Sequence, residues 1–433
     1  MSASRSLYSL AMWLAQPLLR RKLARRGAAE PGYLQAVPER FGHYDGPPDA
    51  GFIWLHAVSL GETRTAAILI NQLRQRLPGM RLLLTNGTAT GRAEGASLLE
   101  PGDVQVWQPW DTPGAVQRFL QHFKPRIGVL LETEIWPNLT AACRQAGVPL
   151  VLANARLSEK SLRRALRLAW IAKPAYQSLA AVWAQTEVGA RRFEQLDAPV
   201  RAVFGNLKFD AKPDAAKIAQ GCAWRAGMGR PVILLASSRE GEEVQFLRVI
   251  QSIRAQPHVA SSNDAMESIE GEVQWLIVPR HPQRFDDVAA LITRHGLGLS
   301  RRSEWTAEPA PADVWLGDSL GEMALYYGLA DVALLGGSFE PLGGQNLIEA
   351  AACGCPVVMG PSTFNFAQAA RLAEAAGAAI RSGSMAQALE TAVTLARDAS
   401  GRAAMAGRAT GFAAAHQGAA DKTADAVVAL LKR

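Results

Sequence analysis

Short apolar runs alternate with helical stretches along most of the chain, and this alternation constrains the fold more than any other feature. The pattern is typical of βαβ units, in which helices cover both faces of a parallel sheet. Five runs in the first half are predicted to be strands: GFIWLHAV (51–58), RLLLTN (81–86), RIGVLLE (126–132), PLVLAN (149–154) and AVWAQT (181–186). Five follow in the second half: PVILLAS (231–237), VQWLIVPR (273–280), DVWLGD (313–318), ADVALLGGS (330–338) and CPVVMGP (355–361).

The two series of strands predict two doubly wound α/β domains, in agreement with a length of 433 residues. GNLKFDAKP (205–213) mixes Gly, Asn and Pro and is predicted to begin the linker between them. A polar stretch, 261–272, is expected to be a surface insertion. We divide the chain into an N-terminal segment (1–27), a first Rossmann-like domain (28–207), a second (208–412) and a C-terminal helix (413–433) that could cross back to the first.

The N-terminal segment joins an apolar stretch to a basic cluster. Leu7, Leu10, Leu14 and Leu18 recur at helical spacing. The stretch of about 13 residues falls short of the roughly 20 that cross a bilayer, so we do not expect it to span one. Trp13 and Tyr8 could lie at headgroup level. The segment is predicted to be an interfacial membrane helix, with an ordinary packed helix as the alternative.

The charge pattern supports a membrane surface as partner. The net charge of +7 indicates an anionic partner, and by itself it leaves nucleic acid, lipid and phosphorylated substrates open. The cations concentrate just behind the apolar stretch, at Arg20, Arg21, Lys22, Arg25 and Arg26. This placement favours an anionic membrane, and we expect no nucleic-acid partner. The four cysteines show neither disulfide nor zinc spacing, which fits a reducing cytoplasm.

Ligands of parallel sheets collect at the carboxyl ends of the strands, so the loops there are the first places to search. After the first strand, HAVSLGET places Ser59, Gly61 and Glu62 at the start of a helix. Glu62 is a candidate base, although Ser59 and Glu62 also have the spacing of a capping box. The helix dipole would lower the pKa of this carboxylate, so a base here requires apolar walls or a second carboxylate.

Further candidates follow later strands of the first half. LLETEIWPN supplies Glu132 and Glu134, and NARLS supplies Arg156, which could meet a phosphate or carboxylate or form a structural ion pair. Lys208, in GNLKFD, lies at the junction between the halves, where a lysine is usually just solvated.

The second half carries the most specific motif, GGSFEPLGGQNLIEAAACGCPVVMGP, beginning at Gly336. Gly343 and Gly344 permit close approach of an anionic ligand to the backbone, and Glu349 could reach ribose hydroxyls. Arg280 in VPRHP and the stretch 320–322 in GDSLGE follow other strands of this half. The predicted ligand is a nucleotide, and no residue pattern requires a metal or cofactor.

These motifs in this order resemble the 3-deoxy-D-manno-octulosonic acid (Kdo) transferases of lipopolysaccharide assembly: HAVSLGET, ETEIWPNL, LANARLS, GNLKFD, VPRHPQRF, GDSLGE and GGQNLIEAAACGCPVVMGP. The resemblance implies a GT-B fold, two Rossmann-like domains facing across a cleft. It implies inverting transfer of Kdo from CMP-Kdo to a lipid A precursor, lipid IVA, at the cytoplasmic face of the inner membrane.

The resemblance also implies roles for particular residues. Glu62 is the implied base, and Glu132 and Lys208 are the implied transition-state stabilisers, Lys208 balancing charge near the Kdo carboxylate. The implied CMP contacts are Pro279, Arg280, Leu320, Gly321, Glu322, Asn346, Leu347, Ile348 and Glu349. Ser59, Gly61 and Arg156 are further candidates for acceptor or phosphate binding. Two alternatives remain open: a GT-B transferase using a UDP-sugar on another membrane lipid, and a non-catalytic nucleotide-binding scaffold at the membrane.

Overall fold

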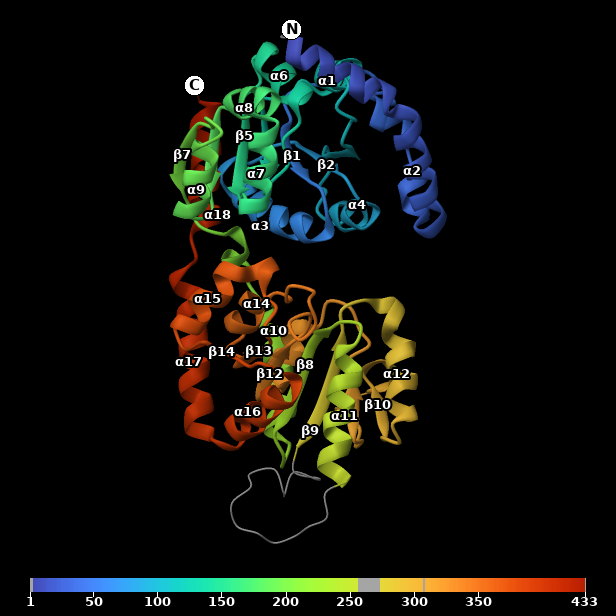
Figure 1. Ribbon diagram of the computed structural model, residues 1–433, viewed down its shortest axis with the longest axis vertical. Coiled ribbons are helices and arrows are strands. Elements are labelled where there is room, and N and C mark those ends of the chain that lie inside the picture. Colours follow the sequence, from blue (N-terminus) through green and yellow to red (C-terminus); the bar gives the residue numbers. More distant parts are fainter. Residues whose placement is uncertain (1–2, 256–272, 307, 433) are drawn as a thin grey trace. The chain divides into compact units, whose positions relative to one another are not determined.

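The chain forms two compact α/β units in the computed structural model, which describes residues 3–255, 273–306 and 308–432 (Figure 1). Unit 1 contains Met1–Ala211 and His416–Arg433, and unit 2 contains Lys212–Ala415. Each unit is built on a 7-stranded sheet whose neighbouring strands pair in parallel. The predicted pair of parallel-sheet α/β domains is therefore confirmed. The expected insertion at 261–272 lies outside the described residues.

The sheet of unit 1 has the strand order β3-β2-β1-β4-β5-β6-β7, so the chain reverses direction across the sheet between β1 and β4. Its central strands are buried on both faces, which explains their uninterrupted apolar sequences. The strands are β1 (Ile53–Ala57), β2 (Leu82–Asn86), β3 (Val104–Trp107), β4 (Ile127–Leu131), β5 (Leu150–Ala155), β6 (Ala181–Ala184) and β7 (Val200–Val203).

Alternate residues of these strands supply two hydrophobic cores, one on each face of the sheet. Phe52 and Trp54 belong to the core under α5 to α9, whereas Ile53 and Leu55 belong to the core under α3 and α18. The helices are α3 (Leu60–Arg76), α4 (Ala89–Ala96), α5 (Pro113–Phe123), α6 (Pro137–Gln145), α7 (Glu159–Arg167), α8 (Ala169–Gln177), α9 (Glu187–Glu194) and α18 (Ala419–Leu431).

Unit 2 repeats the plan with the strand order β10-β11-β9-β8-β12-β13-β14. Its strands are β8 (Val232–Ser238), β9 (Gln274–Pro279), β10 (Leu299–Arg301), β11 (Val314–Leu316), β12 (Val332–Leu335), β13 (Val357–Met359) and β14 (Ala379–Arg381). Its helices are α10 (Ala215–Ala226), α11 (Glu242–Ala255), α12 (Phe285–Arg294), α13 (Met323–Leu329), α14 (Leu347–Ala352), α15 (Ala367–Ala375), α16 (Met385–Arg397) and α17 (Ala399–Ala415).

The unit boundaries differ from the predicted domain boundaries by a few residues. The sequence placed them after residues 207 and 412, whereas the structure divides the chain after Ala211 and Ala415. The reason is the short helix η3 (Leu207–Asp210), which packs with unit 1. Leu207 has no exposed surface and belongs to the core under α3, and Asp210 accepts hydrogen bonds from the backbone at the start of α18. Lys208 therefore belongs to unit 1.

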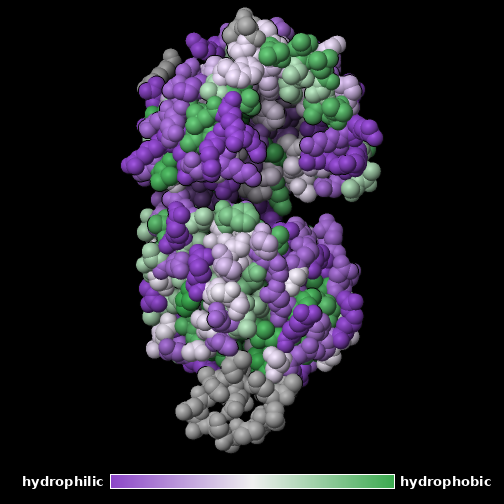
Figure 2. Space-filling view, viewed as in Figure 1, coloured by the Kyte–Doolittle hydropathy of each residue, from purple (hydrophilic) through white to green (hydrophobic). Residues whose placement is uncertain are grey.

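The N-terminal segment forms two helices, α1 (Ala3–Leu14) and α2 (Gln16–Ala29), and hydrophobic side chains gather over α1 while hydrophilic ones cover α2 (Figure 2). Leu7, Leu10, Trp13 and Leu14 are each more than half exposed. Tyr8 does not share this face, because its hydroxyl hydrogen-bonds Asp111 within unit 1. Among the described residues, no helix is long and apolar enough to cross a membrane.

Candidate active site

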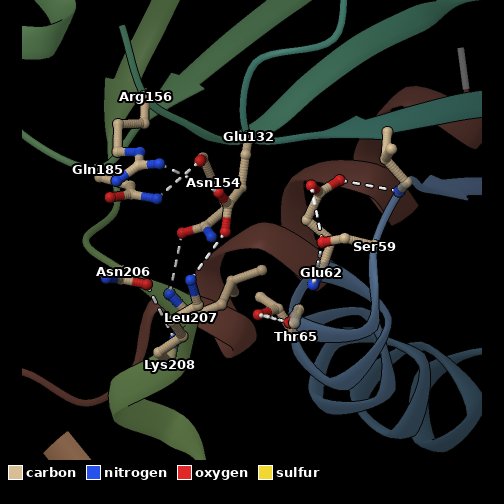
Figure 3. A network of polar contacts seen from close by, with 12 residues as sticks. Ser59, Glu62, Thr65, Glu132, Asn154, Arg156, Gln185, Asn206, Leu207 and Lys208 are labelled. Carbon is tan, nitrogen blue, oxygen red and sulfur yellow. Dashed lines mark hydrogen bonds and ion pairs between the residues drawn. The ribbon is translucent and has the colours of Figure 1, made fainter. Parts of the chain in front are cut away.

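Polar side chains of unit 1 converge at the carboxyl ends of neighbouring strands, as the topology requires. Because β1 and β4 are adjacent in the sheet, the loops that follow them lie side by side. These loops carry Glu62 and Glu132, and the loops after β5 and β7 carry Arg156 and Lys208 (Figure 3). Four segments distant in sequence thereby bring polar side chains together around Glu132 and Glu62.

Glu62 belongs to a capping box at the start of α3. Ser59 is the N-cap, and its hydroxyl oxygen accepts a hydrogen bond from the backbone N–H of Glu62. The carboxylate of Glu62 in turn accepts hydrogen bonds from the backbone N–H of Val58 (2.9 Å) and from the hydroxyl of Ser59 (3.2 Å). The capping role foreseen from the spacing is present, and each carboxylate oxygen keeps acceptor capacity for one further partner.

The surroundings of Glu62 nevertheless favour a base. Burial, opposed by the hydrogen bond from Val58 and aided by the negative charges of Glu132 and Glu134, raises the pKa of Glu62 from 4.5 to about 7. A carboxylate at the start of a helix would otherwise hold its proton less tightly than usual. Burial and two neighbouring carboxylates thus supply the offset that a base at this position requires, and the resulting pKa suits proton transfer near neutral pH.

Glu132 is held in a strained backbone conformation directly after β4. Its φ of 62° lies in the left-handed region, and its side chain is buried. The ammonium of Lys208 donates a hydrogen bond to Oε1 of Glu132 at 3.0 Å, and the guanidinium of Arg156 lies 3.8 Å from Oε2. Arg156 also donates its backbone N–H to the carbonyl of Glu132. The predicted stabilisers Glu132 and Lys208 therefore form an ion pair in which Glu132 is buried and Lys208 is partly exposed, and Arg156 adds a second positive charge.

Two residues that the sequence did not single out hold this pair in place. Asn154, at a φ of 50° within β5, accepts the backbone N–H of Leu207 on its side-chain oxygen at 3.1 Å. Gln185 donates its side-chain amide to the carbonyl of Asn154 at 2.9 Å. Because Leu207 immediately precedes Lys208, Asn154 positions the segment that carries the lysine. The sequence pattern that could have indicated Asn154 is a polar residue at the end of an otherwise apolar strand.

The predicted donor residues all lie in unit 2, at the carboxyl ends of its strands or at the start of the helix α14. Pro279 ends β9, and the backbone N–H of Arg280 donates to the carbonyl of Ser238 at the end of β8 (3.0 Å). Burial and the adjacent Arg239 and Arg280 lower the pKa of His281. The loops after β8 and β9 therefore bring the guanidinium groups of Arg239 and Arg280 close to His281.

The segment 320–322 combines an exposed backbone with an anchored carboxylate. Leu320 is 71% exposed, and Gly321 has a φ of 73° and offers its carbonyl to the ammonium of Lys217 at 2.8 Å. Glu322 accepts hydrogen bonds from the guanidinium of Arg302 (3.0 Å) and the hydroxyl of Ser319 (2.5 Å). The carboxylate of Glu322 is thus already hydrogen-bonded within the protein. Leu320 and the backbone around Gly321, in contrast, face solvent.

The glycine-rich loop before α14 has a conformation that only glycine accepts. Gly343 and Gly344 have φ values of 88° and 73°, and a Cβ on Gly343 would lie 2.6 Å from the side-chain nitrogen of Asn365. Asn346 then caps α14 by accepting the backbone N–H of Ile348 (3.2 Å). Leu347 and Ile348 are buried, and Glu349 follows them in the first turn of α14.

Glu242, which the sequence did not indicate, fixes the other end of this loop. Its carboxylate has no exposed surface and accepts the backbone N–H groups of Arg239 (2.8 Å), Gly337 (2.7 Å) and Phe339 (3.0 Å). Burial raises the pKa of Glu242 despite these bonds. Among the described residues, no group of three or more His, Cys, Asp or Glu is placed to hold a metal ion.

A family model and two relatives of this chain carry the same name. A family model described as 3-Deoxy-D-manno-octulosonic-acid transferase (kdotransferase) matches residues 35–211, which include Glu62, Glu132 and Lys208. A 3-deoxy-D-manno-octulosonic acid transferase of Bordetella pertussis is 46% identical over 433 residues, 98% of each chain. The protein of that name from Haemophilus influenzae is 31% identical over 396 residues, 90% of each chain.

Solved structures agree on the fold. A glycosyltransferase of Rickettsia africae ESF-5 superposes with a TM-score of 0.57 at 12% identity, over 90% of this chain and 100% of that one. Identity this low bears on the architecture alone, and that architecture is the expected GT-B fold with its two parallel-sheet α/β domains. The membrane role expected of α1 stays a prediction.

Proposed function

Because the chain belongs to the 3-deoxy-D-manno-octulosonic acid transferase family, we propose that it takes Kdo from CMP-Kdo and attaches it to a lipid A precursor, lipid IVA, releasing CMP. The enzyme is a glycosyltransferase that transfers Kdo in lipopolysaccharide biosynthesis. We infer the donor, the acceptor and the roles of single residues from this family membership and from the geometry of the site. The observation that supports them best is Glu62, a carboxylate with a pKa of about 7 beside an ordered Glu132–Lys208 pair.

Glu62 acts as the general base in this proposal. An acceptor hydroxyl attacks the anomeric carbon of Kdo while the bond from that carbon to the CMP phosphate breaks. The hydroxyl proton passes to the carboxylate of Glu62, and CMP leaves with the bonding electron pair. Direct displacement inverts the anomeric configuration, and the single step needs one base and no covalent intermediate.

Glu132 and Lys208 stabilise the charge that develops during transfer. The anomeric carbon gains positive character as CMP departs, and a fixed carboxylate such as that of Glu132 stabilises positive charge. Lys208 contributes by holding Glu132 in one orientation through the 3.0 Å contact. The preorganised pair avoids the reorganisation that water would require.

The donor is assigned to unit 2. We propose that CMP binds at Pro279, Arg280, Leu320, Gly321, Glu322 and the segment from Asn346 to Glu349. The guanidinium of Arg280, directly after β9, suits the phosphate of CMP and supplies charge to it as it leaves. No step in this scheme calls for a metal ion or a further cofactor.

Product mass is the direct test. The protein is incubated with CMP-Kdo and a tetraacylated lipid A precursor, and the expected product is heavier by one or more Kdo residues. Glu62→Gln keeps the hydrogen bond to Val58 and is expected to abolish the product. Turnover of UDP-N-acetylglucosamine in place of CMP-Kdo would contradict the proposed donor, and full activity of Glu62→Gln would contradict the proposed base.

The acceptor is a lipid, and we propose that α1 brings the enzyme to it at the cytoplasmic face of the inner membrane. Leu7, Leu10, Trp13 and Leu14 would enter the interface with apolar side chains that are now exposed to water. The exposed cations of α2, Arg20 and its neighbours, would add about 1 kcal/mol each on an anionic leaflet.

Flotation with anionic liposomes tests this anchor. The triple substitution Leu10→Glu, Trp13→Glu and Leu14→Glu is expected to remove most of the protein from the floating fraction. Val188→Glu on α9 is the matched control, since Val188 is 57% exposed and lies outside α1. Unchanged flotation of the triple variant would refute the anchor while leaving the transferase chemistry untouched.

A further inference from the structure

A cavity of about 750 Å³ lies within unit 2, and none of its lining residues is among the predicted donor contacts. Its walls come from the carboxyl ends of three neighbouring strands. Residues 339–341 follow β12, residues 361–364 follow β13, and Arg381 ends β14, while α15 adds Ala367 and Arg371. This is the edge of a parallel sheet at which ligands bind, and the volume falls in the range of small-molecule sites.

The two arginines of the cavity differ in how the protein uses them. Arg381 is occupied, because it donates to the carbonyl of Gly360 (3.1 Å) and the hydroxyl of Thr363 (3.3 Å) and pairs with Glu374 (3.2 Å). Arg371 is exposed on α15, and no residue in the described part of the chain hydrogen-bonds or ion-pairs with it. Its guanidinium is therefore the cation of the cavity that is available to an anionic ligand.

The remaining walls suit a sugar. Ser362 and Thr363 bring hydroxyl groups, and Phe364, 63% exposed, offers an apolar surface to the C–H face of a sugar ring. Glu340 accepts the side-chain amide of Gln245 on Oε1 at 2.5 Å, which leaves Oε2 to accept a sugar hydroxyl. One unpaired guanidinium among hydroxyl, carboxylate and aromatic groups matches a polyhydroxylated acid.

One wall of the cavity is hydrogen-bonded to the glycine-rich loop that leads into the predicted nucleotide site. Asn365 donates its backbone N–H to the carbonyl of Gly343 (2.9 Å), and Gly343 donates its own to the hydroxyl of Ser362 (3.0 Å). The loop after β13 is thereby fastened to the loop that leads into Asn346 and α14. A ligand bound at the start of α14 and one in the cavity would therefore contact two loops that are hydrogen-bonded to each other.

We propose that this cavity holds the sugar of the donor and that Arg371 binds its carboxylate. This inference rests on the proposed function, in which the donor is CMP-Kdo, a molecule with two anionic groups. Arg280 serves the phosphate, and a second cation is needed for the sugar acid. The sequence suggested Lys208 for that purpose, but Lys208 is already paired with Glu132 at 3.0 Å. Arg371 is thus a determinant of specificity for an acidic sugar.

Calorimetry measures the dissociation constants of CMP-Kdo and of CMP, and the difference between them gives the contribution of the sugar to donor binding. Arg371→Met is expected to weaken CMP-Kdo binding about 10- to 100-fold, the effect of losing a charge-assisted hydrogen-bonded pair, and to leave CMP binding unchanged. Arg371→Lys should recover part of the loss, because it restores the charge without the planar fork. Arg294→Met, an exposed arginine on α12, is the matched control and should bind both ligands as the wild type does.

Unchanged CMP binding also shows that the Arg371→Met variant is folded. Equal weakening of CMP and CMP-Kdo would overturn the assignment, as would CMP-Kdo binding at wild-type strength. A variant with normal CMP-Kdo binding and a raised KM for the lipid acceptor would instead assign the cavity to an acceptor phosphate. Wild-type protein that neither binds nor consumes CMP-Kdo would refute the proposed function itself, which separates the two failures.

Discussion

At Glu62 one carboxylate caps a helix and is also the proposed general base. Its hydrogen bonds to Val58 and Ser59 fix the first turn of α3, which also fixes the direction in which this carboxylate points. Glu132 and Glu134 come from a loop some 70 residues later in the chain, and their charges help to raise its pKa to about 7. A capping box and a base are therefore compatible in the same residue.

We predict a pH dependence of transfer that reports this pKa. Only the ionised Glu62 can accept a proton, so kcat/KM should fall about tenfold per pH unit below pH 7 and level off above it. The check is a pH–rate profile from pH 5 to 9 at low acceptor concentration. A profile that is flat across pH 7 would assign proton removal to another group.

Glu62→Gln should also change stability in a pH-dependent way. The folded protein binds this proton more tightly than the unfolded chain, because its pKa is raised from 4.5 to about 7. The stability associated with Glu62 is therefore fully present below pH 4.5 and is lost as the pH rises through 7. Gln is neutral throughout, so the variant should unfold at a higher denaturant concentration than the wild type at pH 8 and at nearly the same one at pH 4. Lower stability at pH 8 would contradict the assigned direction.

Asn154 offers a second prediction at this scale. Both Asn154→Ala and Asn154→Gly leave the buried N–H of Leu207 unpaired, at a cost of about 1–3 kcal/mol. Both should lower kcat, because η3 then holds Lys208 less firmly. The alanine variant should have a lower melting temperature than the glycine variant, because the backbone φ of 50° at position 154 favours glycine. Wild-type kcat in both variants would show that Lys208 needs no such support.

Among the secondary-structure elements, the C-terminal helix α18 depends on Asp210. The carboxylate of Asp210 accepts the backbone N–H groups of Gly418 (2.5 Å) and Ala420 (2.8 Å), and α18 buries Ala424 and Val427 against α3. Asp210→Ala should lower the free energy of unfolding by about 0.5–2 kcal/mol, as loss of a cap does. Asp425→Ala, which removes only an exposed ion pair with Arg76, should cost less than about 0.5 kcal/mol. Equal losses in the two variants would contradict the capping role.

The elements that the sequence missed are the edges of both sheets. β3, β7, β10 and β14 pair on one side only, and each contains residues that are not buried. A strand at an edge needs no continuous apolar run, so its sequence resembles that of a loop. The central strands, buried on both faces, were recognisable for the opposite reason.

For the whole molecule, the separate cores of the two units predict two unfolding transitions. Phe119 belongs to a core of unit 1 and Phe246 to a core of unit 2, and both are fully buried. Each substitution to alanine should destabilise its own unit by about 3–5 kcal/mol and shift only that transition in urea. CMP should raise only the transition that Phe246→Ala lowers, because a ligand stabilises the unit that binds it. One transition shifted equally by both variants would refute independent cores.

The sequence by itself determined the two parallel-sheet units, the helix starts and the loops that carry Glu62, Glu132, Lys208 and the donor motifs. It could do so because buried strands and helix caps produce local residue patterns that can be recognised in the sequence alone. Only the tertiary structure decided that Lys208 pairs with Glu132, that Asn154 and Glu242 support their loops, and that Arg371 has no partner among the residues that the structure describes. These facts depend on which strands are neighbours and on which side chains already have hydrogen-bond or ion-pair partners. Contacts between residues far apart in the chain produce no periodic pattern in the sequence.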